Sequence, residues 1–454
     1  MSLRRLFGTN GVRGVFGKDL TLDLALRLSY ALATYYREGP LLLAYDGRYS
    51  SPLIAGVIKA GLNAMGIDVY DAGLVPTPCL QYCTRRLGYR GGVMITASHN
   101  PPEYNGIKVM ASDGVEIPRE DELRIEEIYF SNRFIESKGI GMDGRLGNAV
   151  DIYLQGITSL VDVDRIRSKS MKVVVDLGNG AQAVAVPRML EMLGCKVVTL
   201  NERIDGSFPG RGSEPTVDNL GDLATKVRES NADLGVAYDG DGDRSIFCDE
   251  EGNVYTGDRS GALLVEQVLA KEVRGGRSAE LKVVTPVNSS MLIDIVAARY
   301  GAKVVKTKVG SVEVSREMVR TSALVGLEEN GGFMYSKHIP VRDGAMSTAL
   351  ILEALASRSE PLSKIMSGYK RFYQYKTKFP CGREQASRII DALKDRSLRV
   401  ESVDGVKIWV DDESWIMVRQ SGTEPIIRLY AESSDEQRLR SIVDSYMEMI
   451  RSLL

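Results

Sequence analysis

Three carboxylates alternate with glycine in the segment Asp239-Gly240-Asp241-Gly242-Asp243, directly after the apolar run 234–238. Glycine at every second position lets the backbone turn tightly, so that the three side chains converge on one point. Converging carboxylates are costly unless a cation neutralises them. A three-carboxylate site with an open face suits a hard ion, so the spacing predicts a Mg²⁺ site; the alternative is a solvated acidic turn.

A small polar loop, Thr96-Ala97-Ser98-His99-Asn100, follows a second apolar run at 92–95. A loop of small residues at a strand end presents the Ser98 hydroxyl to a cleft. We therefore interpret Ser98 as a nucleophile or a phosphate-carrying serine. The alternative is a serine that caps a turn.

Two further loops carry polar groups around glycine. In the segment 419–428, two arginines flank two hydroxyls and a run of backbone N–H groups, which favours an oxyanion receptor. The segment 326–332 offers a carboxylate and an amide of the kind that bridge neighbouring sugar hydroxyls. The alternatives are a strand turn with solvated arginines and a plain loop. Arg13 and Arg48 lie in two more loops.

Composition excludes several classes of protein. The 454 residues carry 58 Lys+Arg against 60 Asp+Glu, and a formal net charge of -2 does not support a broad basic surface for nucleic acid. Two histidines, His99 and His338, cannot build a histidine zinc centre. No apolar run approaches the roughly 18 residues of a membrane span, and no signal peptide is expected. Five scattered cysteines form no disulfide framework and favour a reduced, cytoplasmic setting; Cys79 and Cys83 are expected to be buried on one helix face.

The elements that must position these loops recur three times: an apolar strand, a helix, then glycine and a short strand. The first strands are 41–46, 172–176 and 282–285. Gly66, Gly194 and Gly301 fall where a helix end takes a left-handed residue. This pattern predicts three βαβ-type domains, each a mixed sheet with covering helices, although chance similarity between common βα units is the alternative.

The last segment has a different pattern. Residues 399–410 alternate like one strand, 411–414 form a turn, 415–418 and 426–431 are strands, and an amphipathic helix starts at 434. The predicted fold class is therefore α/β, with three related mixed α/β domains followed by a smaller α+β C-terminal domain. The expected domains are 1–147, 148–252, 253–369 and 370–454, which carry the Ser98, aspartate, sugar and phosphate loops in turn.

The loops TASHNP, DGDGDR, GLEENGG and RQSGTEPIIR, in this order, resemble the α-D-phosphohexomutase superfamily, which includes phosphomannomutase/phosphoglucomutase and phosphoglucosamine mutase. The resemblance implies a central cleft among four domains. It also implies interconversion of mannose or glucose 1-phosphate and 6-phosphate through a phosphoserine and a sugar 1,6-bisphosphate. The expected partners are sugar phosphates, without nucleic acid or membrane, and a homo-oligomer is left open.

The resemblance also implies roles for individual residues. Ser98 matches the phosphorylated serine, and Asp239, Asp241 and Asp243 match the Mg²⁺ ligands, joined by a phosphoserine oxygen. The remaining matches are Lys108 for proton transfer, His99 as a polar or proton-relay neighbour, Arg244 beside the metal loop, Arg13 near the phosphoserine, Glu328 and Asn330 at sugar hydroxyls, Lys308 for sugar orientation, and Arg419, Ser421, Gly422, Thr423 and Arg428 at the non-transferring phosphate.

Two departures bear on the sugar. Asn330 stands where many relatives have serine, and Gly332 where many have histidine. Gly422 resembles the phosphoglucosamine and archaeal-type branches. We therefore keep phosphoglucosamine mutase as the alternative to a mannose/glucose enzyme. A phosphatase acting through phosphoserine and a non-catalytic sugar-phosphate-binding protein are more remote alternatives.

Overall fold

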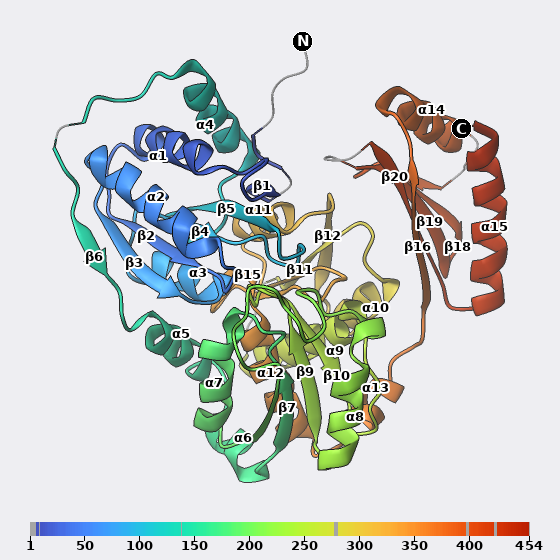
Figure 1. The fold of residues 1–454 in the computed structure, drawn as a ribbon. Helices are drawn as coiled ribbons and strands as arrows, with labels where there is room; N and C mark the ends of the chain where they lie inside the picture. The colour runs from blue at the N-terminus through green and yellow to red at the C-terminus, as the bar shows by residue number, and fades with distance from the viewer. Residues whose placement is uncertain are drawn as a thin grey trace.

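The computed structural model describes residues 6–8, 10–137, 139–276, 280–395, 399–421 and 425–453. Within these ranges the chain forms four sheets in succession, each with its own helices (Figure 1). The first sheet contains β1 (Val12–Val15), β2 (Leu41–Tyr45), β3 (Val69–Leu74), β4 (Gly91–Ile95), β5 (Tyr104–Ala111) and β6 (Asp143–Arg145), with α1 (Leu22–Tyr36), α2 (Ser51–Ala64), α3 (Thr77–Arg86) and α4 (Arg119–Ser131).

The second and third sheets follow without a long linker. The second contains β7 (Lys172–Asp176), β8 (Lys196–Leu200), β9 (Leu234–Tyr238) and β10 (Ser245–Cys248), with α5 (Ala149–Thr158), α6 (Val163–Lys169), η1 (Ala181–Val184), α7 (Val186–Met192), η2 (Val217–Asn219) and α8 (Gly221–Ser230). The third contains β11 (Lys282–Pro286), β12 (Lys303–Thr307), β13 (Val325–Leu327), β14 (Phe333–Tyr335) and β15 (Ile339–Arg342), with α9 (Gly257–Arg274), α10 (Met291–Arg299), α11 (Ser311–Thr321), α12 (Gly344–Arg358) and α13 (Leu362–Ser367).

These three sheets share one internal topology. The strand orders include β5-β4-β2-β3, β10-β9-β7-β8 and β14-β13-β11-β12. In each, a central strand pairs in parallel with two later strands, and the second of these pairs antiparallel with the next. The predicted repetition is therefore confirmed, and the apolar central strands are buried because helices cover both faces of such sheets.

The three glycines of the repeat have the predicted backbone. Gly66, Gly194 and Gly301 have φ of +82°, +76° and +64° just after α2, α7 and α10. This left-handed conformation is open to glycine without steric cost. The helix therefore ends there, and the chain turns into the next parallel strand.

The fourth sheet is antiparallel throughout its described strands, as the sequence predicted. The single strand expected over residues 399–410 is wrong, because Gly405 takes φ +73° and the chain reverses before it continues. The sheet contains β16 (Tyr373–Pro380), β17 (Val400–Glu401), β18 (Val406–Asp411), β19 (Ser414–Gln420) and β20 (Ile426–Ser433), with α14 (Arg383–Asp395) and α15 (Glu436–Leu453).

The two faces of the fourth sheet are buried differently. Ile416 and Val418 of β19 pack under α14 and α15, which cover the outer face in Figure 1. Trp415 and Met417 of the same strand point the other way. They pack against Val287, which directly follows β11 of the third sheet. The period-two alternation of β19 thus joins the fourth sheet to the rest of the molecule. No helix of the described residues is long and apolar enough to cross a bilayer.

Candidate active site

Three of the predicted functional loops follow equivalent strands of the three related sheets. Ser98 lies in the loop after β4, Asp239 follows β9 directly, and Glu328 follows β13 directly. In open α/β sheets, ligands bind beyond the carboxyl ends of parallel strands. The repeat therefore brings the three loops to one centre.

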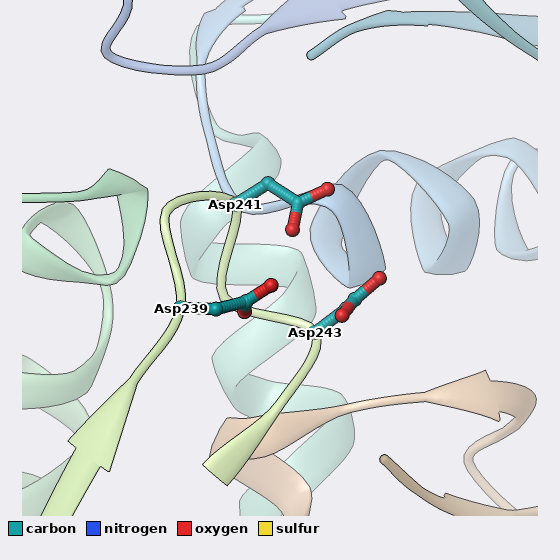
Figure 2. Close-up of side chains that lie close together, drawn as sticks. All are labelled: Asp239, Asp241 and Asp243. Atoms are coloured by element: carbon teal, nitrogen blue, oxygen red, sulfur yellow. The ribbon is translucent and has the colours of Figure 1, made fainter. Parts of the chain in front are cut away.

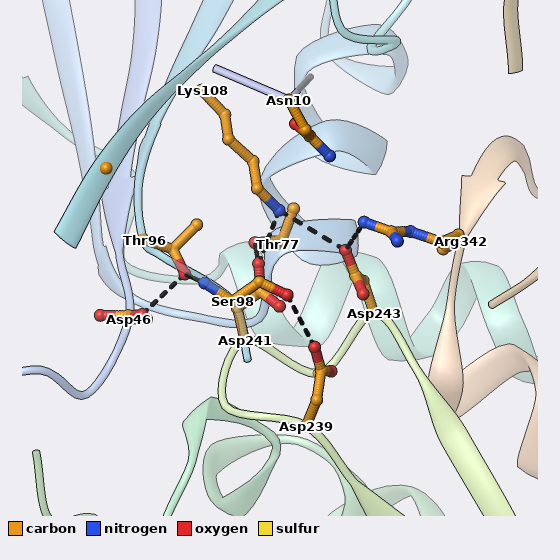
Figure 3. A network of polar contacts seen from close by, with 12 residues as sticks. Asn10, Asp46, Thr77, Thr96, Ser98, Lys108, Asp239, Asp241, Asp243 and Arg342 are labelled. Atoms are coloured by element: carbon orange, nitrogen blue, oxygen red, sulfur yellow. Dashed lines mark hydrogen bonds and ion pairs between the residues drawn. The ribbon is translucent and has the colours of Figure 1, made fainter. Parts of the chain in front are cut away.

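Ser98 lies at the base of this centre and is completely buried. Its Oγ donates to Asp239 Oδ2 at 2.8 Å (Figure 3). His99 Nδ1 lies 3.4 Å from Ser98 Oγ. Ser98 has φ +51°, which is uncommon for a residue other than glycine. The loop therefore holds the hydroxyl in a conformation that the surrounding contacts must enforce.

Those contacts come mainly from Arg48, which the sequence placed among the loop arginines. Its guanidinium is buried and donates to the carbonyl oxygens of Ser98 and three further residues, so it faces the back of the loop. Thr96 Oγ1 accepts from the Ser98 N–H at 2.8 Å and donates to Asp46 Oδ2 at 2.7 Å. Asp46 also accepts from Arg48 Nε at 3.1 Å. One buried ion pair therefore fixes the serine loop.

The three aspartates converge as predicted (Figure 2). Each is buried, and one oxygen from each lies within 4.8 Å of the others. Burial, followed by the charges of Asp243 and Asp241, raises the pKa of Asp239 well above its ordinary value. Asp241 Oδ1 and Asp243 Oδ1 are buried, and no described residue donates a hydrogen bond to either oxygen. Unpaired buried carboxylate oxygens are costly, so the donor set fits a hard divalent cation.

Lys108 supplies part of the counter-charge. It is completely buried on β5, and its Nζ donates to Asp241 Oδ2 at 2.8 Å and to Asp243 Oδ2 at 3.5 Å. Thr77 Oγ1 donates to the same Asp241 oxygen at 2.6 Å. Burial alone would raise the pKa of Asp241, but Lys108 and these hydrogen bonds lower it below its ordinary value.

A cleft of about 730 Å³ lies beside this cluster, and its lining includes His99 and Arg244, the residues next to Ser98 and Asp243. Five arginines line it among the described residues, with one carboxylate from Glu328, so the cleft suits an anionic ligand. Burial and the charges of Arg244 and Arg13 lower the pKa of His99 to about 2. The predicted site residues in the lining are Arg13, His99, Arg244, Glu328, Asn330 and Arg428.

Other predicted residues lie elsewhere. Arg419 is held by Asp404, whose Oδ2 lies 2.9 Å from Arg419 Nε and accepts from the Val309 N–H at 3.0 Å. Lys308 is exposed beside that contact. Ser421 is buried and donates its N–H to Ile426 O at 2.9 Å. Gly422 and Thr423 lie outside the described residues.

Sequence reasoning missed three residues of this centre and one outside it. Arg342 and Arg383 line the cleft, and Thr77 holds Asp241. These three lie in elements far along the chain from the groups they meet, so no local spacing marks them. Outside the centre, Asp404 meets Arg419 because β18 pairs with β19.

The chain matches known proteins over nearly its whole length. Four family models of phosphoglucomutase/phosphomannomutase match it: α/β/α domain I over residues 4–136, domain II over 151–252, domain III over 256–372 and the C-terminal domain over 378–449. The chain therefore belongs to the phosphoglucomutase/phosphomannomutase family, whose members are enzymes that transfer phosphate intramolecularly.

Individual relatives agree with this assignment. A phosphoglucosamine/phosphogalactosamine mutase of Sulfurisphaera tokodaii is 42% identical over 98% of this chain and 99% of its own. A phosphoglucomutase/phosphomannomutase of Thermococcus kodakarensis is 38% identical over 99% of both chains. The crystal structure of a phosphoglucomutase/phosphomannomutase family protein from Burkholderia thailandensis superposes with a TM-score of 0.88, at 27% identity over 99% of this chain and 97% of that one.

Proposed function

We propose that this enzyme interconverts hexose 1-phosphates and hexose 6-phosphates through phosphorylated Ser98 and a sugar 1,6-bisphosphate. One observation carries the proposal: the Ser98 hydroxyl bonds to Asp239, and the next residue, His99, lines a cleft rich in arginine. In this proposal Ser98 has the cation site on one side and the phosphorylated sugar on the other.

The proposed reaction has two transfers. The free hydroxyl of a hexose monophosphate attacks the phosphorus of phosphoserine 98, and the bond from phosphorus to the serine oxygen breaks. Lys108 or His99 relays the hydroxyl proton to the serine oxygen that leaves. The bisphosphate then turns in the cleft, and the Ser98 oxygen attacks its other phosphorus. The bond from that phosphorus to the sugar oxygen breaks, and the serine proton passes to the sugar oxygen. Arg419, Ser421, Gly422, Thr423 and Arg428 hold the phosphate that is not transferred.

The metal is proposed as one Mg²⁺ held by Asp239, Asp241 and Asp243, with an oxygen of phosphoserine 98. When bound, it would neutralise charge on the transferring phosphoryl group. In this proposal Arg244 and Arg13 stabilise that charge from the cleft. Glu328, Asn330 and Lys308 receive and orient the sugar.

Two sugar classes are candidates for the substrate. The loop motifs fit both classes. The Thermococcus relative, named phosphoglucomutase/phosphomannomutase, favours mannose and glucose phosphates. The Sulfurisphaera relative, named for glucosamine and galactosamine phosphates, favours an amino sugar. Turnover of mannose, glucose and glucosamine 1-phosphates, measured side by side, ranks the two classes.

Ser98→Ala tests the mechanism. With catalytic glucose 1,6-bisphosphate present, we expect the variant to lose isomer formation by at least about a thousandfold while it still binds glucose 6-phosphate. Ser137→Ala, which removes an exposed surface hydroxyl, serves as the matched control and should retain full rate. Full turnover by Ser98→Ala contradicts the phosphoserine, and release of inorganic phosphate in place of isomer indicates a phosphatase.

We also propose the domain division 1–147, 148–252, 253–369 and 370–454, supported by one sheet in each range. The cytoplasm is the proposed location. All five cysteines are free and buried, which suits a reducing compartment.

A further inference from the structure

Arg342 is the last residue of β15, and its side chain is almost fully buried beside the cleft. To reach the centre, the side chain crosses the backbone of Gly332. A Cβ at position 332 would lie 2.3 Å from Arg342 Cδ and 2.9 Å from its Cγ. Those atoms are in the middle of the side chain, so Gly332 and Arg342 fit only as a pair.

The guanidinium joins two loops of different sheets. Its Nη2 donates to Asp243 Oδ2 at 2.5 Å (Figure 3). Its Nη1 donates to Glu328 Oε2 at 3.2 Å. The planar fork of arginine can bind two carboxylates at once, which a lysine ammonium on a flexible stem does far less well. Arg342 therefore connects a proposed metal ligand to a proposed sugar contact.

The charges around Asp243 show what this connection does. Lys108 Nζ lies 3.5 Å from Asp243 Oδ2, and Arg244 Nε lies 3.9 Å from its Oδ1. Arg342 is the nearest of the three cations. A positive charge at this distance opposes a divalent cation on the same carboxylate, while the contact with Glu328 orients the group that would meet the sugar.

We propose that Arg342 is a positioning residue with two opposite effects: it aligns Glu328 for the sugar and restrains cation binding at Asp243. The proposal rests on the proposed function of Glu328 and the aspartates. It predicts that loss of Arg342 strengthens cation binding and weakens sugar-phosphate binding, whereas a merely structural residue would weaken both.

The test is calorimetric titration of the full chain with Mg²⁺ alone, and with glucose 6-phosphate in Mg²⁺. For Arg342→Gln we expect Mg²⁺ to bind about tenfold tighter and glucose 6-phosphate about tenfold weaker or more. Arg342→Lys keeps the charge, so Mg²⁺ binding should stay near that of the wild type while sugar-phosphate binding weakens. Arg320→Gln on the surface of α11 is the matched control.

Gly332→Ala provides an independent check, because it retains Arg342 but displaces it. We expect the same signs as for Arg342→Gln. Two results for Arg342→Gln overturn the proposal: weaker binding of both ligands, or unchanged binding of either ligand. Melting temperatures of Arg342→Lys and the wild type show whether a folding defect contributes. If the wild-type chain binds no hexose phosphate, both the proposed function and the proposed alignment of Glu328 are overturned. The proposed restraint of cation binding at Asp243 is tested separately, by the Mg²⁺ titration alone.

Discussion

At the scale of single residues, the centre depends on Lys108. A motif match in the sequence predicted it as a proton carrier. In the structure its ammonium lies between the carboxylates of Asp241 and Asp243, buried away from solvent. Removing one partner of a buried ion pair leaves an uncompensated charge, which costs far more than the pair itself contributes.

Lys108→Met tests this counter-charge. Without Mg²⁺ we expect the unfolding free energy to fall by about 3 kcal/mol, because Asp241 and Asp243 lose a cation they cannot exchange for water. In millimolar Mg²⁺ the loss should be smaller, since a bound divalent cation replaces the missing charge. Denaturant unfolding in chelator and in Mg²⁺ measures both.

Lys59→Met is the matched control. Lys59 also pairs with two carboxylates, Asp71 at 3.6 Å and Asp143 at 3.2 Å, but all three groups are partly exposed. Such a pair contributes about 1 kcal/mol or less and should not respond to Mg²⁺. An equal loss for Lys108→Met in chelator and in Mg²⁺ would contradict the metal site.

At the scale of elements, the loop after β4 shows how one arginine sets the conformation of the serine loop. Arg48 donates to four carbonyl oxygens of the serine loop, and Asp46 neutralises it from behind. The sequence indicated a loop arginine but not the direction of its side chain. That direction depends on β5, which returns antiparallel to β4 and closes the loop around the guanidinium.

Arg48→Lys should separate loop geometry from charge. The ammonium still faces Asp46 but cannot serve four carbonyls, so we expect a stability loss of about 2–4 kcal/mol and at least a tenfold slower phosphorylation of Ser98. Phosphorylation by glucose 1,6-bisphosphate, followed by intact mass, measures the rate. Arg316→Lys is the control, because Arg316 donates to the carbonyl oxygens of Val115 and Glu116. Its replacement should lower stability and leave the phosphorylation rate unchanged.

At the scale of the whole molecule, His338 joins three regions of the chain. Its ring lies 4.2 Å from that of Tyr82 on α3 and 5.6 Å from that of Tyr153 on α5, centroid to centroid. Tyr153 Oη donates to Asp343 Oδ1 at 2.6 Å, and His338 Nδ1 lies 3.6 Å from Asp343 Oδ2. Burial lowers the pKa of His338 to about 3 and raises the pKa of Asp343 to about 6.

These two shifts predict opposite pH effects. As pH falls below about 6.5, unfolded His338 takes up a proton that the folded chain refuses until about pH 3, so stability falls; at pH 5 the loss is about 2 kcal/mol. Asp343 acts the other way: between pH 6 and 3.8 the folded carboxyl binds its proton first, so stability rises as pH falls.

Melting of two variants at pH 5 and 7 separates the effects. His338→Phe should become more stable relative to the wild type as the pH falls, because it removes a buried imidazole that is protonated more easily in the unfolded chain. Asp343→Asn should become less stable relative to the wild type over the same range. Protonation of Asp343 removes a buried charge from the wild type and so stabilises it. Reversed signs for both variants would indicate an imidazolium–carboxylate pair in place of two neutral groups.

Sequence alone determined the parts of this protein that depend on neighbouring residues. The glycines at 66, 194 and 301 end their helices through local backbone sterics, and the spacing of Asp239, Asp241 and Asp243 brings their carboxylates together within one turn. The repeated strand–helix order followed from the same short-range patterns. The prediction of one strand over residues 399–410 failed at Gly405, where the alternating apolar pattern gave no sign that the chain reverses.

Tertiary structure alone decided which distant groups meet. Arg342 reaches Asp243, and Thr77 reaches Asp241, because sheet order and packing set those distances. Charge and hydrogen bonding between such groups depend on separation and burial, which no spacing along the chain encodes. The sequence therefore predicted the functional loops and the chemistry proposed for them. The assembled sheets decided which cation neutralises which carboxylate.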